Sequence, residues 1–166
     1  MIEYIIPIAS LKQGLYEYDF EVTDGFFQHF EDSLLQKGTL KVRLELEKRS
    51  GLIELQFDIQ GSVITTCDRC LEEMAFPIDE NQHMVVKYSD ELEDDLEVSY
   101  IPFGTEMMDV SKFIYEYIHL AIPMAKTHED IGEDCPVHLE DFLDEDDTAD
   151  DNAPSVWDAL KNINTN

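Results

Sequence analysis

The sequence predicts an α+β protein with a mostly antiparallel β-sheet or partial barrel, two helices and a flexible acidic C-terminal tail. Several stretches of the first hundred residues alternate apolar and polar side chains, as half-buried strands do. Two other stretches, 24–38 and 108–123, repeat apolar residues at helical spacing. Residues 129–151 contain many acids and no Lys or Arg, and such like-charged segments seldom pack into a core.

Strand-like alternation first occurs at residues 16–22, "YEYDFEV". It returns at 39–48 and at 52–61. A short turn containing Gly51 separates these two runs, so together they predict a β-hairpin. Further strands are expected at 73–89, as one or two elements, and at 97–103.

The first predicted helix covers residues 24–38, with Asp24 as its N-cap and Gly38 as its stop. Its spacing would bring five apolar side chains onto one face. They are Phe26, Phe27, Phe30, Leu34 and Leu35.

The second predicted helix, at 108–123, has the strongest helical pattern in the chain. Asp109 is suited to cap it and Pro123 to end it. We expect its apolar face to cover one side of the sheet. That face contains Val110, Phe113, Ile114, Tyr117, Ile118 and Ala121.

These patterns divide the chain into three parts. A folded β-rich core is expected at 1–125, and an acidic, largely disordered segment at 126–153, which carries His128 and Cys135. A short C-terminal helix is expected at 154–166.

The C-terminal segment "APSVWDALKNI" has an apolar face and the only Trp of the chain. It is too short to be stable as an isolated helix, so it must pack against something. Two interpretations stay open: it docks on a partner, or it packs back on its own domain. In the first, the partner-binding residues would be Trp157, Leu160 and Ile163.

The net charge of −27, from 38 acids and 11 bases, is extreme for 166 residues. Such a surface repels phosphate backbones and attracts basic proteins. We therefore expect a basic protein partner and no direct binding to naked nucleic acid. The alternative is that the acids only keep the protein soluble.

The N-terminal run "MIEYIIPIAS" has no basic residues before its apolar part and no small-residue cleavage site, so we expect no secretory signal. No stretch approaches the roughly 20 apolar residues of a membrane span. These features predict a cytoplasmic protein that does not enter a membrane. Three cysteines in a reducing compartment do not suggest a disulfide framework.

The motif "CDRC" at residues 67–70 has three possible explanations. A thiol–disulfide oxidoreductase would use Cys67 and Cys70 at the start of a helix, but the residues that follow alternate like a strand. A structural zinc site needs four nitrogen or sulfur ligands. Cys135 and His128 are the expected partners in a Cys3His site, and His128 is preferred to His138. The third explanation is that the thiols are reduced and only pack.

No other motif predicts catalysis. The chain has no Ser/His/Asp order, no Gly-rich phosphate loop and no H-E-x-x-H. We expect a protein that is not an enzyme, with the oxidoreductase at Cys67 and Cys70 as the alternative.

Three stretches taken together resemble a known family: "GSVITTCDRCLEEMAFPI", "DVSKFIYEYIHLAIPMAKTHEDIGEDC" and "APSVWDALKNI". They follow the order and approximate spacing of the YceD family, the large ribosomal RNA subunit accumulation proteins. The resemblance covers most of the chain. It rests on a strand that runs into C-x-R-C-L, a helix that ends at Pro, and a His/Cys cluster after that Pro.

The resemblance implies a non-enzymatic role in the accumulation of large-subunit ribosomal RNA, and hence in biogenesis of the large subunit. The charge then points to a basic ribosomal protein or a pre-ribosomal particle as the partner. Some family members have a second cysteine pair after the helix. This sequence has His128 and Cys135 there, which argues against a four-cysteine site and leaves Cys3His open.

Overall fold

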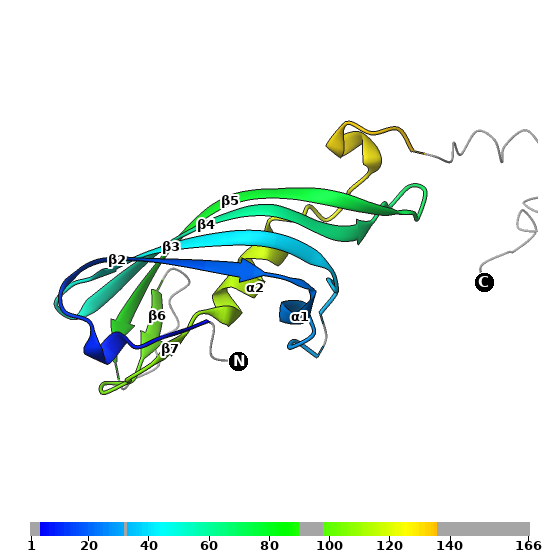
Figure 1. Cartoon of the computed structure of the whole chain (residues 1–166). Coiled ribbons are helices and arrows are strands. Elements are labelled where there is room, and N and C mark those ends of the chain that lie inside the picture. The colour runs from blue at the N-terminus through cyan, green and yellow to red at the C-terminus, as the bar shows by residue number, and fades with distance from the viewer. Residues whose placement is uncertain (1–3, 32, 90–97, 136–166) are drawn as a thin grey trace, which may run out of the picture.

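The computed structural model describes residues 4–31, 33–89 and 98–135 of the chain. One layer is a long curved sheet of five strands in the order β2-β3-β4-β5-β6, and helix α2 lies against its concave side (Figure 1). Neighbouring strands are antiparallel except for β5 and β6, which are parallel. The strands are β2 (Gly14–Val22), β3 (Gly38–Lys48), β4 (Leu52–Thr66), β5 (Glu73–Tyr88) and β6 (Val98–Ile101).

The predicted hairpin is confirmed as β3 and β4, and its alternating residues form the core. Cross-strand partners such as Leu44 and Phe57, or Leu46 and Leu55, lie on the concave face and are fully buried. Because side chains alternate between the two faces of a strand, their polar neighbours face solvent on the convex side. The mostly antiparallel α+β prediction is therefore correct, and the sheet is open rather than closed into a barrel.

Helix α2 (Ser111–Leu120) covers the concave face, as predicted. Ile114 and Ile118 are fully buried, and the ring of Tyr117 lies 5.2 Å from that of Phe57, measured between centroids. The N-cap of α2 is Val110 rather than the predicted Asp109. The Asp109 carboxylate, one residue earlier, still accepts a hydrogen bond of 2.8 Å from the Ser111 N–H.

Two short strands hold the N-terminal region beneath the sheet. β1 (Ile5–Ile6) pairs with β7 (Met108–Asp109) in an antiparallel ladder, and a 3-10 turn, η1 (Ile8–Ser10), leads from β1 towards β2. This two-stranded ladder ties the start of the chain to the residues just before α2.

The helix predicted at 24–38 is wrong beyond its first turn. Helix α1 spans only Asp24–Phe27, with Phe26 and Phe27 buried. Asp24 does not cap it: its carboxylate accepts a hydrogen bond of 2.9 Å from the backbone N–H of Gly38, the first residue of β3. Leu35 is buried and Leu34 is 91% exposed, so these two residues do not share the predicted face.

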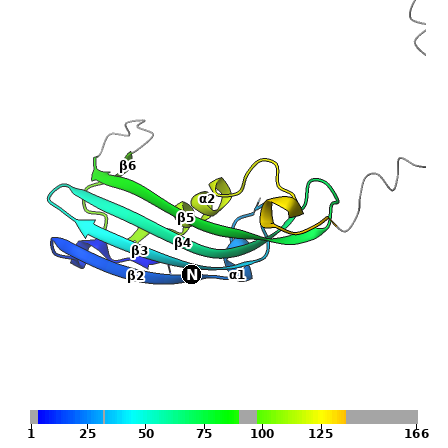
Figure 2. The same cartoon turned by 90° about the horizontal axis from the view of Figure 1, so that it is seen from above.

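The stretch predicted as one or two strands forms the single strand β5, Glu73–Tyr88, in spite of Pro77. Pro77 pairs with Ser62 of β4, whereas β6 accompanies only Val85–Tyr88 of β5. At Pro77 the strand is therefore a sheet edge, where a missing N–H costs no ladder hydrogen bond. In the view from above, β4 and β5 extend together towards the end of the molecule that carries the yellow turn (Figure 2).

Residues after α2 continue in an ordered path to Cys135 and contain a second 3-10 turn, η2 (His128–Ile131). The later part of the acidic segment and the C-terminal helix, with Trp157, Leu160 and Ile163, lie outside the described residues. Among residues 4–31, 33–89 and 98–135, no helix is long and apolar enough to cross a membrane.

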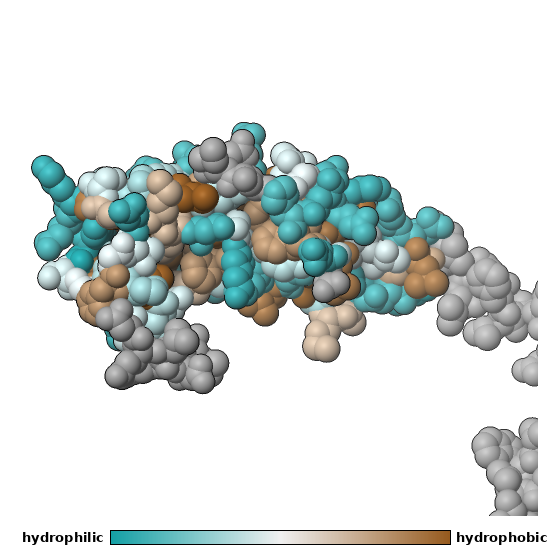
Figure 3. Space-filling model, turned by 90° about the horizontal axis from the view of Figure 1, so that it is seen from below, coloured by the Kyte–Doolittle hydropathy of each residue, from teal (hydrophilic) through white to brown (hydrophobic). Residues whose placement is uncertain are grey.

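The face opposite the sheet shows apolar side chains among polar ones (Figure 3). Leu120 is 75% exposed, and Leu34 and Met124 line a shallow hollow with Ile122. These exposed side chains lie around the end of α2 and the segment that leads to η2.

Candidate metal centre

The C-x-x-C motif occupies the turn between β4 and β5, at the far end of that long hairpin (Figure 1). The Cys67 N–H donates to the Glu72 carbonyl at 2.9 Å, and the Leu71 N–H donates to the Cys67 carbonyl at 3.0 Å. Leu71 has a positive φ of 63°, so the chain reverses sharply there. The turn brings Cys67 and Cys70 to one side while the chain passes into β5.

The second pair of residues comes from η2 and the loop that follows it. Thr127 and Asp130 form a reciprocal capping box that starts the turn, and Gly132, with φ 77°, ends it. The Glu133 N–H donates to the His128 carbonyl at 2.8 Å. His128 and Cys135 are both buried by this turn.

A polar clamp joins the two segments. The Asp68 N–H donates to the Lys126 carbonyl at 2.8 Å, and the Lys126 N–H donates to the Asp68 carboxylate at 2.7 Å. One residue further along the turn, the Arg69 guanidinium forms an ion pair with Glu129. These contacts connect the segment that carries His128 and Cys135 to the C-x-x-C turn.

The four side chains meet in one cluster: the ligand atoms of Cys67, Cys70, His128 and Cys135 all lie within 4.8 Å of one another. Cys67 Sγ lies 3.8 Å from Cys135 Sγ. His128 Nδ1 lies 3.4 Å from Cys70 Sγ and 3.8 Å from Cys135 Sγ. Tetrahedral zinc, with Zn–S about 2.3 Å and Zn–N about 2.0 Å, requires ligand separations of about 3.8 Å for S–S and about 3.5 Å for S–N. The residues present therefore fit a Cys3His zinc site.

The two buried thiols differ in acidity. Burial raises the pKa of Cys67, but hydrogen bonds from the backbone N–H groups of Cys70, Arg69 and His128 outweigh it and lower the pKa to about 6. Burial and the neighbouring sulfurs of Cys67 and Cys70 raise the pKa of Cys135. Cys67 is consequently a thiolate near neutral pH, which is the form that binds a metal.

The surroundings differ from those of a thiol–disulfide oxidoreductase. A catalytic C-x-x-C begins a helix whose dipole activates an accessible thiol. Here the motif lies in a hairpin turn, Cys67 has no exposed surface, and all three cysteines are free.

The structure thus brings together the four residues that the sequence nominated as metal ligands. His138, the histidine that the sequence reasoning set aside, lies outside the described residues. Sequence reasoning missed the clamp of Asp68 with Lys126 and of Arg69 with Glu129. Opposite charges at these positions were visible in the sequence, but nothing in their spacing indicated that they pair.

The protein-family model "Large ribosomal RNA subunit accumulation protein YceD" matches residues 55–164. Searches of curated proteins and of solved structures returned no match. The matched region begins within β4 and includes the C-x-x-C turn, α2 and η2. Since it spans well over half of the chain, this protein belongs to the YceD family of large ribosomal RNA subunit accumulation proteins.

Proposed function

We propose that this protein is a non-enzymatic factor in biogenesis of the large ribosomal subunit, which promotes accumulation of its RNA by binding a basic protein partner. The observation that carries the proposal is the family match over residues 55–164, because the family's name refers to large-subunit ribosomal RNA. The proposal puts this action in the cytoplasm, where the partner is a basic ribosomal protein or a pre-ribosomal particle.

The charge supports a protein partner over naked RNA. A net charge of −27 opposes every phosphate contact, whereas it favours association with a chain rich in Lys and Arg. Such an adaptor would mask the partner's charge until RNA replaces it. Association would be fast at low salt and would weaken as the screening length falls below about 8 Å.

The C-terminal segment would act as a tethered anchor for the same partner. Trp157, Leu160 and Ile163 gain from burial, and a tether raises the local concentration of an anchor near a partner that is already held electrostatically. Trp157→Ala should weaken partner binding at least about tenfold, as expected for an interface Trp, and leave the melting temperature unchanged. A lower melting temperature with unchanged binding would mean that the segment packs on its own domain.

Zinc in this proposal has a structural role. Cys67, Cys70, His128 and Cys135 would supply all four ligands, so no coordination position stays open for substrate. The metal would lock η2 onto the β4–β5 turn and so set where the acidic segment leaves the body.

Metal analysis of anaerobically purified protein tests this role, with one zinc per chain expected. His128→Ala should abolish stoichiometric zinc. His83→Ala is the matched control, because His83 is exposed on β5 and is not in the cluster. Wild-type protein without zinc would leave the reduced, metal-free thiols as the explanation.

Depletion of the protein tests the biological role. Large-subunit ribosomal RNA should fall relative to small-subunit RNA, and tagged protein should capture basic large-subunit proteins. Reduction of insulin disulfides by the purified protein, lost in Cys67→Ser, would support the oxidoreductase instead.

A further inference from the structure

The strand β2 is an open edge of the five-stranded sheet. All nine of its residues pair with β3 on one side, from Gly14 opposite Lys48 to Val22 opposite Leu40. In both ribbon views β2 is the outermost strand (Figures 1 and 2). Within the described residues, one hydrogen bond reaches its outer side: the Tyr4 hydroxyl donates to the Glu21 carbonyl at 2.7 Å.

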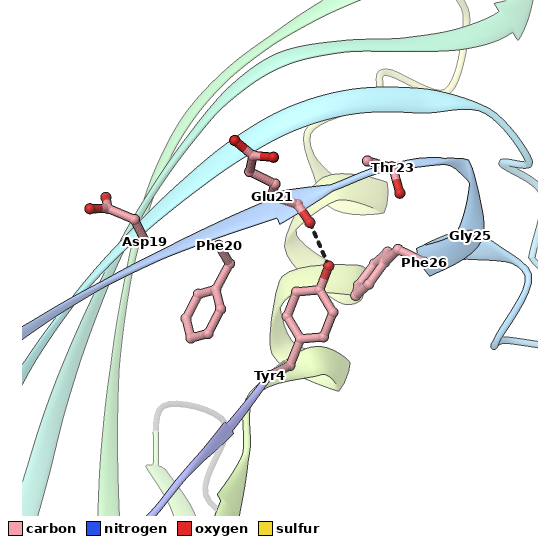
Figure 4. A pocket seen from close by; sticks show the side chains of 7 residues that line it. All are labelled: Tyr4, Asp19, Phe20, Glu21, Thr23, Gly25 and Phe26. Atoms are coloured by element: carbon pink, nitrogen blue, oxygen red, sulfur yellow. Dashed lines mark hydrogen bonds between the residues drawn. The ribbon is translucent and has the colours of Figure 1, made fainter. Parts of the chain in front are cut away.

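That bond shows which backbone groups point outward. In an antiparallel strand the N–H and C=O of one residue point to the same side, and successive residues alternate. Because the Glu21 carbonyl points away from β3 towards Tyr4 (Figure 4), Asp19 and Glu17 also present their N–H and C=O groups on the open edge. No hydrogen bond among the described residues meets those backbone groups. The edge can therefore accept another strand.

A groove of about 630 Å³ runs along this edge. Phe20, Tyr4 and Phe26 line it next to one another, with the Tyr4 ring in the middle, as the close-up shows (Figure 4). The Tyr4 ring lies 5.5 Å from Phe20 and 5.0 Å from Phe26, between centroids. Tyr4 and Phe26 are buried, so Phe20 is the ring that stays partly exposed in the groove, beside the outward backbone groups of β2. A bound strand with alternating side chains could place an apolar side chain against it.

The charged side chains along this edge indicate which kind of strand could bind there. Glu17, Asp19 and Glu21 point to the convex face and are exposed. On β3, Arg43 pairs with Asp19 at 3.3 Å and Lys41 is opposite Glu21, whereas the residue opposite Glu17 is Glu45, another acid. A row of acids along an open edge favours a strand that carries Lys or Arg on the same face.

A second copy of this chain fits the edge poorly. Two β2 edges pairing with each other would place these acids beside the same acids, and like charges across strands are destabilising. RNA is disfavoured for the same electrostatic reason.

We propose that the open edge of β2 is the docking site for an extended, Lys/Arg-rich segment of the partner protein, which joins the sheet as an additional strand. Its basic side chains face the acids of β2, and an apolar side chain between them packs against Phe20 in the groove. This inference rests on the proposed function, since it names how the basic partner is held.

The test uses a short peptide of alternating Lys and Val as the probe and hydrogen exchange of the full chain as the readout. The outward amides of Glu17 and Asp19 should exchange fast in the free protein and slow at least about tenfold when the peptide binds. Asp19→Pro should weaken binding at least about tenfold, because it removes an outward donor without breaking the β2–β3 ladder. Asp19→Ala keeps the donor and should weaken binding only about twofold, as loss of one exposed charge does.

Backbone methylation of the probe tests the same idea on the unmodified protein. In a bound strand, alternate amides point towards β2. Methylating either all Lys or all Val amides should weaken binding at least about tenfold, while methylating the other set should have little effect. Which set matters shows whether the strand is parallel or antiparallel. Equal effects of the two methylations would overturn the proposal, because the peptide would then be held by charge alone.

Other outcomes would also overturn it. A concentration-dependent dimer that protects the same amides would identify a second copy as the occupant, and protection by an RNA oligonucleotide would identify a nucleic acid. If Asp19→Pro captures basic ribosomal proteins as well as the wild type does, the docking site is wrong and the proposed function stands. If neither captures them, the proposed function itself fails.

Discussion

The body of the sheet and the far end of the β4–β5 hairpin are stabilised by different means. The body buries 23 residues in one apolar cluster between the sheet, α2, β1 and α1. In the part of the chain that the structure describes, the far end has a separate cluster with three buried members, Cys67, Met74 and Cys135. Backbone hydrogen bonds, two ion-pair clamps and four side chains able to bind a metal surround that small cluster. The far end buries little apolar surface, so hydrogen bonds, ion pairs and the four side chains able to bind a metal take over the stabilising role of a hydrophobic core there.

The largest loss of stability is expected from a substitution in the body of the sheet. Phe57→Ala removes a fully buried ring that packs on Tyr117 and should lower the free energy of unfolding by about 3–5 kcal/mol. Chemical denaturation measures this loss. The zinc content of the variant that remains folded should be unchanged, because the far end does not depend on this core. Simultaneous loss of zinc would show that the two regions are one cooperative unit.

The second largest effect is expected from removal of the proposed zinc, and it should be confined to the far end of the β4–β5 hairpin. Removing zinc with a chelator should lower amide protection in the C-x-x-C turn and in η2, because metal-binding energy there is folding energy. Protection of β3 and the central part of β4 should stay the same. Hydrogen exchange with and without chelator makes this comparison, and a uniform loss across the sheet would contradict it.

Gly61 of β4 packs closely against β3. It pairs with Leu40 and has a φ of 151°. A Cβ there would lie 2.7 Å from Leu40 Cα and would also clash with the Thr39 carbonyl. Gly61→Ala should therefore destabilise the protein by more than about 1 kcal/mol, as measured by denaturation. Gly51→Ala is the control at a turn of positive φ with nothing near the added carbon, and a smaller loss there would isolate the clash.

The smallest effect should be a pH dependence of the metal-free far end. The pKa of Cys67, about 6, lies below its ordinary value of 9.0. Ionisation of Cys67 therefore stabilises the metal-free fold fully above pH 9.0, and this contribution is lost as the pH falls through 6. Thiolate absorbance of the chelated protein should show one step near pH 6 that is absent in Cys67→Ser. A first step near pH 9 would contradict the hydrogen bonding described for Cys67.

The alternation of apolar and polar residues correctly predicted the central strands of the body. Strict alternation at 39–48 and 52–61 predicted β3 and β4, since only one face of these strands is buried. The prediction failed at 24–38, where the aromatic spacing resembles a helix. There the helix ends after Phe27, and the chain that follows buries Leu35 in the core while Leu34 stays exposed.

The sequence by itself determined the chemistry of this protein: its charge, the alternation that builds the sheet, and the four side chains able to bind zinc. Ligand type and proximity to the end of α2 were enough to prefer His128, because metal chemistry admits few residue types. Only the tertiary structure decided how distant segments meet. The clamp between Asp68 and Lys126 and the open edge of β2 beside Tyr4 depend on contacts between residues far apart in the chain, and no local pattern encodes such contacts.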